Sequence, residues 1–141
     1  MKPRIADWPE AEARVMPLRM AVFVVEQGVP VEMERDDDDP VSRHAWIETP
    51  DGEVVATGRL LPDGHIGRMA VRADRRGEGL GSRVLLALIE AALELGFEYV
   101  VLNAQTGAMP FYAAHGFIAE GPVFMEAGLP HQVMRRRLRP S

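Results

Sequence analysis

The chain contains no cysteine, and this absence excludes several chemistries at once. Disulfide bonds, thiolate metal sites and cysteine nucleophiles all need a sulfur atom that this protein does not carry. Aromatic residues are also few, at 6% of the 141 residues. No apolar run reaches the roughly 20 residues that a membrane-spanning helix needs, because Pro17 and Arg19 interrupt the most apolar early stretch. We therefore expect a soluble, cytoplasmic protein with no signal peptide, no membrane contact and no bound metal.

What is present is ordinary for a globular protein, with 47% hydrophobic and 26% charged residues. A chain of this length suits one compact domain, so we expect a single domain over residues 1–141. The net charge of −5 argues against a nucleic-acid partner. Four of the acids form one run, Asp36–Asp39, and the other 17 nearly balance the 16 basic residues. The acidity is therefore local.

The N-terminal part of the chain predicts a short edge strand followed by helices. Residues 2–8 are long enough for the strand, and Asp7 is placed to cap the helix that follows. Pro17 lacks an amide hydrogen, so we expect it to kink this helix or to begin a second helix over residues 18–26. The polar and acidic residues 30–40 predict a loop.

Beyond residue 42 the pattern alternates between strands and helices. Apolar and β-branched segments separated by Pro-Asp-Gly turns predict three antiparallel strands, at residues 43–49, 53–61 and 65–71. A wide apolar stripe predicts a helix from Ser82 to Gly96, made by Val84, Leu85, Leu88, Ile89 and Ala92. The short apolar run at 99–102 predicts a buried strand, which a βαβ connection would make parallel to the strand before the helix. We expect a short helix and two closing strands at residues 108–115, 117–125 and 132–138.

The most informative segment is the glycine loop, residues 75–82, with the sequence Arg-Arg-Gly-Glu-Gly-Leu-Gly-Ser. Its three glycines allow a ligand to approach the backbone closely, and the free amides and dipole of the next helix favour an anion. Five arginines between Arg68 and Arg83 add cationic donors that fit phosphate oxygens. No lysine follows the glycines, and Ser82 stands where a dinucleotide-binding loop has its last glycine, so nucleotide kinases and nicotinamide enzymes are disfavoured.

These residues resemble those of a known family. The segment Arg76–Gly81 is similar to the R/Q-x-x-G-x-G/A signature of the GCN5-related N-acetyltransferases, and Phe111–Phe117 to their F-Y-x-x-x-G-F segment. The order of the predicted elements also fits, over nearly the whole chain. A closer resemblance, to the ElaA-like subfamily, rests on Arg19, Val22–Gln27, the acidic run, His44, Asn103–Gln105 and Gly128–His131.

The resemblance implies both a fold and a cosubstrate. The fold would be α/β, with a mixed, mostly antiparallel central sheet flanked by helices and a splayed parallel strand pair. The cosubstrate would be acetyl-coenzyme A, with its pyrophosphate on the backbone of Arg76, Gly77, Glu78, Gly79, Leu80, Gly81 and Ser82. Its pantetheine arm would contact Met69, Ala70, Val71, Asn103 and Tyr112.

Acetyl transfer to an amine needs a base for the amine, a donor for the developing oxyanion and a proton for the leaving thiolate. Tyr112 is the candidate general acid, since a phenol near pKa 10 can protonate a thiolate; packing on the Gly-Phe turn is its other reading. His131 is one candidate base. Glu26 is another, if partial burial raises its pKa. Direct attack is expected, because no cysteine is present to carry the acetyl group.

The acceptor is expected to be a small-molecule or peptide amine. The acidic run lacks the glycine of a calcium loop, so it is either a solvated loop or a funnel for a cationic amine. His44 is expected to pack in the core or on a face of the sheet, and Arg135–Arg137 to lie on an exposed strand. A non-catalytic acyl-coenzyme A sensor and a different phosphate-ligand enzyme remain alternatives, as does a homodimer beside a monomer.

Overall fold

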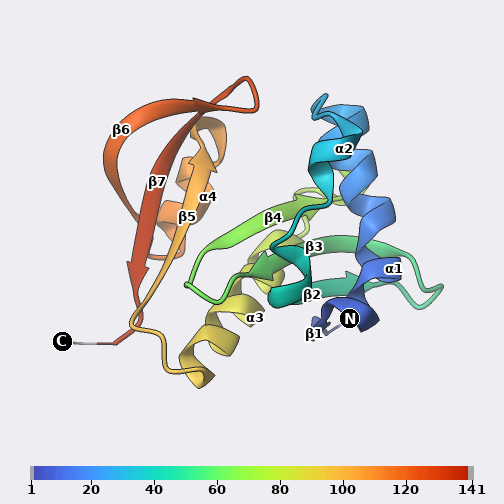
Figure 1. Ribbon diagram of the computed structural model, residues 1–141. Helices are drawn as coiled ribbons and strands as arrows, with labels where there is room; N and C mark the ends of the chain where they lie inside the picture. The colour runs from blue at the N-terminus through green and yellow to red at the C-terminus, as the bar shows by residue number, and fades with distance from the viewer. Residues whose placement is uncertain (1, 140–141) are drawn as a thin grey trace.

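The computed structural model describes residues 2–139, which form two antiparallel sheets standing side by side (Figure 1). The first sheet has the order β1-β2-β3-β4, made by Arg4–Asp7, Arg43–Glu48, Val54–Leu60 and Ile66–Val71. The second has the order β5-β7-β6, made by Tyr99–Gln105, Leu129–Arg137 and Ile118–Glu126. The expected edge strand, the two hairpins and the two closing strands are therefore confirmed.

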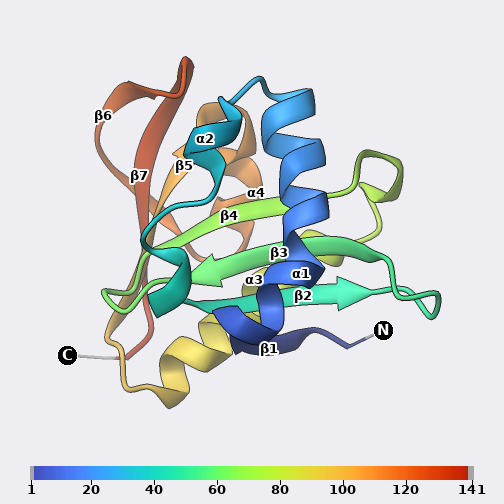
Figure 2. The same cartoon turned by 45° about the vertical axis from the view of Figure 1, so that its right-hand side comes forward.

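Helices cover both faces of the first sheet. The long helical run α1 (Trp8–Arg19) and η1 (Met20–Glu26) crosses one face, and α3 (Leu80–Glu94) lies against the other (Figure 2). The shorter helical segments are α2 (Val31–Glu34), η2 (Asp39–Val41), η3 (Ala73–Arg75), η4 (Thr106–Ala108) and α4 (Met109–Ala114). The expected mixed α/β architecture, with mostly antiparallel sheet and flanking helices, is confirmed.

The apolar stripe of α3 forms the centre of the main hydrophobic core. Its predicted members are all buried: Val84, Leu85, Leu88, Ile89 and Ala92. They pack with buried side chains of both sheets, such as Val55 of β3 and Leu102 of β5. Burying each large apolar side chain stabilises the fold by about 1.5–3 kcal/mol. Because α3 buries side chains against both sheets, it holds them together.

At Pro17 the N-terminal helical run differs from the expected start of a second helix. Pro17 lies inside α1 and begins no second helix; the helix continues and widens into a π-helix from Met20 to Glu26. Asp7 occupies the N-cap position as expected, yet its side chain makes no capping hydrogen bond. It lies instead 3.7 Å from the Nε of Arg43 on the neighbouring strand.

Three further elements differ from their predicted form or bounds. Residues 30–40 are not a plain loop, because they contain the single turn α2 and the start of η2. The helix α3 begins at Leu80, two residues earlier than expected, and β5 extends three residues further, to Gln105. Both extensions bring ordered backbone closer to the glycine loop and to the open end of the second sheet.

The strands β4 and β5 separate from each other, and this splay is the feature that positions the site. Within residues 2–139 their parallel pairing is limited to one bridge, between His65 and Val101, and beyond it the strands diverge (Figure 1). Residues 67–71 of β4 therefore have β3 on one side and no strand on the other. The expected parallel pair exists as a splayed pair, and the sheet opens between them.

Candidate active site

The glycine loop ends at the free N-terminus of α3. Gly77 and Gly79 have positive φ angles of 84° and 81°, and Gly79 is the N-cap of the helix. The first amide bonded back into the helix is that of Arg83, which donates to the Gly79 carbonyl at 3.2 Å. The amides of residues 80–82 precede this bond, so they are available at the positive end of the helix dipole. The backbone here is built to receive an anion.

Gly81 brings the loop against two other elements of the site. A Cβ at Gly81 would lie 3.4 Å from Val71 of β4 and 3.5 Å from the ring of Phe111 on α4. At the next residue, the Ser82 hydroxyl is 2.9 Å from Nε2 of His115, at the end of α4. The start of α3, the end of β4 and the helix α4 therefore meet at one point.

The arginines around the glycine loop are already engaged with acidic partners. Arg72 donates to Glu53 and Asp74, each at 2.7 Å. Arg75 donates to Glu78 at 3.1 Å. These pairs are exposed, and exposed pairs contribute little to stability. We conclude that they can exchange a carboxylate for another anion at small cost.

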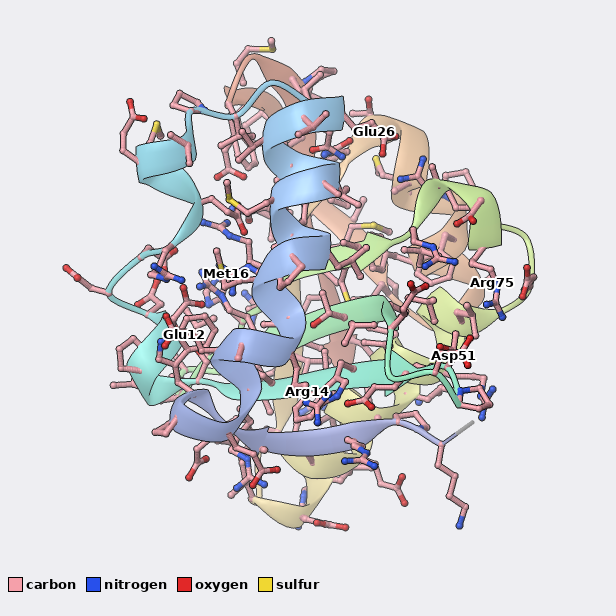
Figure 3. The ribbon with its side chains drawn as sticks, turned by 90° about the vertical axis from the view of Figure 1, so that its right-hand side faces the viewer. Glu12, Arg14, Met16, Glu26, Asp51 and Arg75 are labelled. Atoms are coloured by element: carbon pink, nitrogen blue, oxygen red, sulfur yellow. The ribbon has the colours of Figure 1, made fainter. Side chains whose placement is uncertain are left out.

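Glu26 lies in this arginine-rich surface, and its expected burial is wrong. Its side chain is 41% exposed at the end of η1, on the side of the molecule where Figure 3 also shows Arg75 of the loop. Both of its carboxylate oxygens accept hydrogen bonds from Arg76, each at 2.7 Å. These bonds hold the pKa of Glu26 below its usual value, opposite to the expected rise. A carboxylate held in this way is a weak base.

Tyr112 is buried on α4, with 9% of its surface exposed. Its ring meets those of Phe111 and Phe117 edge-on, with centroids 5.1 and 5.8 Å apart. Burial raises the pKa of the phenol to about 12. Tyr112 therefore does pack as an aromatic side chain against the Gly-Phe turn. The same burial keeps the phenol protonated at any ordinary pH.

His131 lies on β7, directly opposite Gln105 at the end of β5. It is buried, and its ring stacks on Phe124 with 6.0 Å between the centroids. Its Nδ1 donates to the Leu129 carbonyl at 2.8 Å. Because a carbonyl can only accept, the neutral ring carries its lone pair on Nε2, which lies 3.6 Å from the Glu126 carboxylate. That nitrogen is placed to accept a proton.

Two polar side chains on β5 make contacts at the open end of the splay. Asn103, an expected ligand contact, is exposed, and its Nδ2 donates to Glu126 at 3.3 Å. Gln105 donates to Gln27, just after η1, at 3.2 Å. This bond joins the second sheet to the N-terminal helices; it has no sequence signal, because the two glutamines are 78 positions apart.

The acidic run is neither a fully solvated loop nor an open acidic funnel. Asp39 is fully buried and Asp36 half-buried, while Asp37 and Asp38 are exposed. Arg19 and Arg59 each lie 2.8 Å from Asp39, and Arg59 lies 2.7 Å from Asp36. Half of the run is therefore neutralised inside the protein. The histidine nearest to it, His44, is buried and donates from Nε2 to the Asp39 carbonyl at 3.0 Å, which confirms its expected core position.

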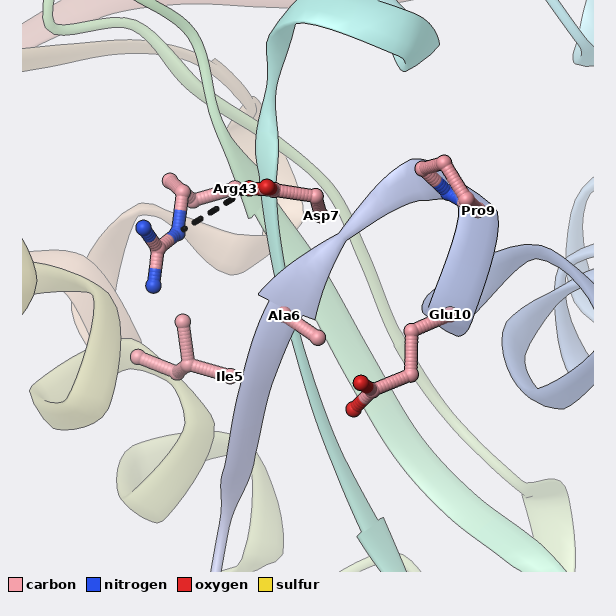
Figure 4. Close-up of a pocket in the computed structure, with 6 residues that line it drawn as sticks. All are labelled: Ile5, Ala6, Asp7, Pro9, Glu10 and Arg43. Carbon is pink, nitrogen blue, oxygen red and sulfur yellow. Dashed lines mark ion pairs between the residues drawn. The ribbon is translucent and has the colours of Figure 1, made fainter.

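A surface pocket lies apart from this arrangement, at the outer edge of the first sheet (Figure 4). It is lined by Ile5, Ala6, Asp7, Pro9, Glu10 and Arg43. Within residues 2–139, no group of three or more acidic or histidine side chains is arranged to hold a metal ion. None of the helices over the same residues is long and apolar enough to cross a membrane.

Comparison with known proteins gives a consistent result. A family profile described as "Acetyltransferase (GNAT) domain" matches residues 11–138. The uncharacterized N-acetyltransferase YjcF of Bacillus subtilis is 38% identical over 141 residues, which cover 96% of this chain and 99% of the relative. Two proteins of known crystal structure, Escherichia coli ElaA and an acyl-CoA N-acyltransferase from Pseudomonas aeruginosa, are each 31% identical in sequence to this chain. Both match 96% of this chain and 99% of their own, with TM-scores of 0.86 and 0.85.

Proposed function

Because the chain belongs to the GNAT acetyltransferase family, we propose that it transfers the acetyl group of acetyl-coenzyme A to a primary amine by direct attack. The observation that carries the proposal is the splay between β4 and β5, with the free helix N-terminus of α3 beside the end of β4. This arrangement offers one place for an extended acyl thioester and one for its phosphates.

The phosphates would lie on the glycine loop. The amides of residues 80–82 and the positive φ angles of Gly77 and Gly79 support a close backbone approach to a pyrophosphate. The neighbouring arginine pairs are exposed, so Arg76 is able to leave Glu26 for a phosphate oxygen. The backbone supplies the shape of this site, and the arginines add charge.

The pantetheine arm and the thioester would lie along the free edge of β4. Strand residues Met69, Ala70 and Val71 have no strand partner on the side that faces β5, so backbone groups there are open to a ligand. An amide in this position can donate to the thioester oxygen as negative charge develops on it. Asn103, on the facing strand, would contact the same arm.

The reaction moves two protons while one bond forms and one breaks. The amine nitrogen attacks the carbonyl carbon, a C–N bond forms, and the C–S bond breaks to release a thiolate. Tyr112 would protonate that thiolate; burial raises the pKa of its phenol to about 12, so the phenol carries its proton when the thiolate forms. His131 would accept the proton from the amine at Nε2, because its Nδ1 is occupied by the Leu129 carbonyl. We prefer His131 to Glu26, which Arg76 holds as a weak base.

The absence of cysteine makes the function simple to test. Release of coenzyme A can be followed with a thiol reagent without any signal from the protein, over a panel of small amines and peptides. We expect Tyr112→Phe to lower kcat about 100-fold, the usual contribution of a general acid, and to change the dissociation constant of coenzyme A less than about threefold. Tyr99→Phe is the matched control: Tyr99 is the first residue of β5, and its substitution should leave both values unchanged.

Two results would contradict parts of this proposal. Full turnover by Tyr112→Phe would remove the tyrosine from the mechanism while leaving acetyl transfer intact. Coenzyme A binding by the wild-type protein without turnover of any amine would favour the non-catalytic sensor.

A further inference from the structure

The bend in β4 is centred on a residue with an unusual backbone conformation. Arg68 has a φ of 51°, in the left-handed region that side chains other than glycine avoid. Among residues 2–139, the other non-glycine residue with positive φ is Ala127, in the tight turn between β6 and β7. A turn explains Ala127, whereas Arg68 lies in the middle of a strand. Such a conformation costs roughly 1–2 kcal/mol and persists only where its surroundings impose it.

The pairing of β4 with β3 shows that Arg68 belongs to a β-bulge. Gly67 pairs with Arg59 and Ala70 pairs with Thr57, so Arg68 and Met69 together face the single residue Gly58. An extra residue of this kind bends its strand and increases the local twist. The bulge begins at Arg68, three residues after His65, which forms the parallel bridge to Val101 of β5. It therefore stands where the two strands part.

The side chain of Arg68 ties the bulge to the segment around α2. Its Nη2 donates to the Asp36 carboxylate at 3.1 Å and to the carbonyl of Glu34 at 3.3 Å. Its Nη2 also lies 3.4 Å from the Met33 carbonyl, and its Nε lies 3.5 Å from the Glu34 carboxylate. Four acceptors from one short segment thus converge on a single guanidinium.

Those acceptors are themselves fixed by buried ions. Arg19 lies 2.6 Å from Glu34 and 2.8 Å from Asp39, and all three side chains are buried. Arg59 of β3 bridges Asp39 and Asp36 at 2.8 and 2.7 Å. Burial alone would raise the pKa of Asp39, but the hydrogen bonds and charges of the two arginines outweigh it, so this carboxyl stays ionised. With Arg68 the buried ion network has three arginines and three buried or half-buried carboxylates, whose charges balance. A fourth carboxylate, that of the exposed Asp38, lies 3.9 Å from Arg59 at the edge of the network.

This arrangement is costly as a source of stability alone. Removing charges from water costs several kcal/mol per ion, and well-packed apolar residues of the same size often stabilise a fold as well or better. What a balanced ionic network provides is a fixed geometry, because each guanidinium accepts only certain directions of approach. Here the geometry is passed to the backbone of β4 through Arg68.

We propose that Arg68 is a positioning residue that holds the bulge of β4, with the buried ion network as its rigid mount, and that this keeps β4 apart from β5 in the shape that receives the acyl thioester. Arg68 touches no substrate in this proposal. It acts through the backbone of Met69–Val71, and this part rests on the proposed function. Through Asp36 and Asp39, the acidic run thereby helps to shape the cosubstrate site.

The test compares two substitutions at one position. Arg68→Ala removes the anchor and leaves a residue that disfavours positive φ, while Arg68→Asn removes the anchor but tolerates that φ. Arg35→Ala is the control, because Arg35 belongs to the same segment but forms an exposed pair with Glu12. Two quantities are measured: hydrogen–deuterium exchange of residues 66–71 without ligand, and coenzyme A affinity by calorimetry.

We expect faster exchange in both Arg68 variants, and a dissociation constant for coenzyme A about tenfold higher in Arg68→Ala and about threefold higher in Arg68→Asn. Arg35→Ala should match the wild type in both measurements. Unchanged exchange and unchanged affinity in Arg68→Ala would overturn the inference, as would a lower melting temperature with unchanged affinity of the folded protein. If the wild type binds no coenzyme A, the proposed function fails, and faster exchange in Arg68→Ala would still support the anchoring of β4.

Discussion

Arginines meet carboxylates in two regions of this protein, and the regions differ in exposure. In the buried ion network, Arg19 and Asp39 are 1% and 0% exposed. Around the glycine loop, Arg75 and Arg76 hold their partners at similar distances of 3.1 and 2.7 Å, but on the surface. Hydrogen-bond length therefore does not distinguish the two regions, and access to water does.

The difference shows how one residue type serves two purposes. A buried pair cannot release one partner without stranding the other charge, so it fixes geometry. An arginine in an exposed pair can exchange its carboxylate partner at little cost, so it is suited to bind a phosphate. Arg68 lies between the two regions in sequence and takes part in the buried one, through Asp36.

The largest effect is expected in the buried region. Asp39→Asn keeps the size of the side chain but removes the charge that Arg19 and Arg59 share, so we expect a loss of about 3–5 kcal/mol in the free energy of unfolding. Denaturant titration measures it. Arg75→Ala, which breaks an exposed pair, should cost less than about 1 kcal/mol. Similar losses in the two variants would contradict this difference between the two regions.

A second effect concerns the residue that faces the bulge. A Cβ at Gly58 would lie 2.5 Å from Sδ of Met69, 3.0 Å from Leu88 and 3.2 Å from Val84. Gly58→Ala should therefore destabilise the protein by about 1–3 kcal/mol and weaken coenzyme A binding, because Met69 must move. Gly107→Ala is the control, since nothing lies within 4 Å of a Cβ there and its φ is ordinary. Normal coenzyme A affinity in Gly58→Ala would show that the bulge does not influence binding at the cosubstrate site.

A third prediction concerns acid. Burial lowers the pKa of His44 in the folded protein, while in the unfolded chain this residue takes up a proton near pH 6.5. The unfolded state therefore binds more protons below that pH, and the free energy of unfolding should fall there by at most about 1.4 kcal/mol per pH unit. Denaturant titrations from pH 7 to 5 measure this slope, which His44→Gln should make shallower. An unchanged slope would show that other groups cause the acid loss.

The smallest effect is expected at the exposed pair of Glu26 and Arg76. Glu26→Gln frees Arg76 for a phosphate, so coenzyme A should bind about two- to fivefold more tightly at low salt, with kcat nearly unchanged. Calorimetry at two salt concentrations and the thiol assay measure both. A kcat lowered 100-fold would instead restore Glu26 as the catalytic base.

Local features of the fold could be predicted from the sequence, because their signals lie close together in the chain. The stripe of α3, the hairpin turns and the glycine loop each depend on residues within a few positions of one another. The buried ion network could not be predicted, since Asp39 lies 20 positions from both Arg19 and Arg59. A run of four acids looks solvated until its distant partners are known.

Contacts between distant residues also explain what could not be predicted at the site. The apolar residues before Glu26 indicated partial burial, but its carboxylate lies on the surface, where it is paired with Arg76, 50 positions away. His131 could be named as a base from its type, but its free nitrogen follows only from the contact with Leu129. The bulge at Arg68 has no local signal, because neither glycine nor asparagine marks the position of positive φ.

The central claim is that acetyl-coenzyme A lies in the splay, with its thioester end on β4 and its phosphates on the glycine loop. Hydrogen–deuterium exchange of the wild-type protein with and without acetyl-coenzyme A tests it most directly. We predict slower exchange in residues 67–71 and 77–84, and no change in β2. Protection confined to other surfaces, or no protection at saturating ligand, would contradict the account.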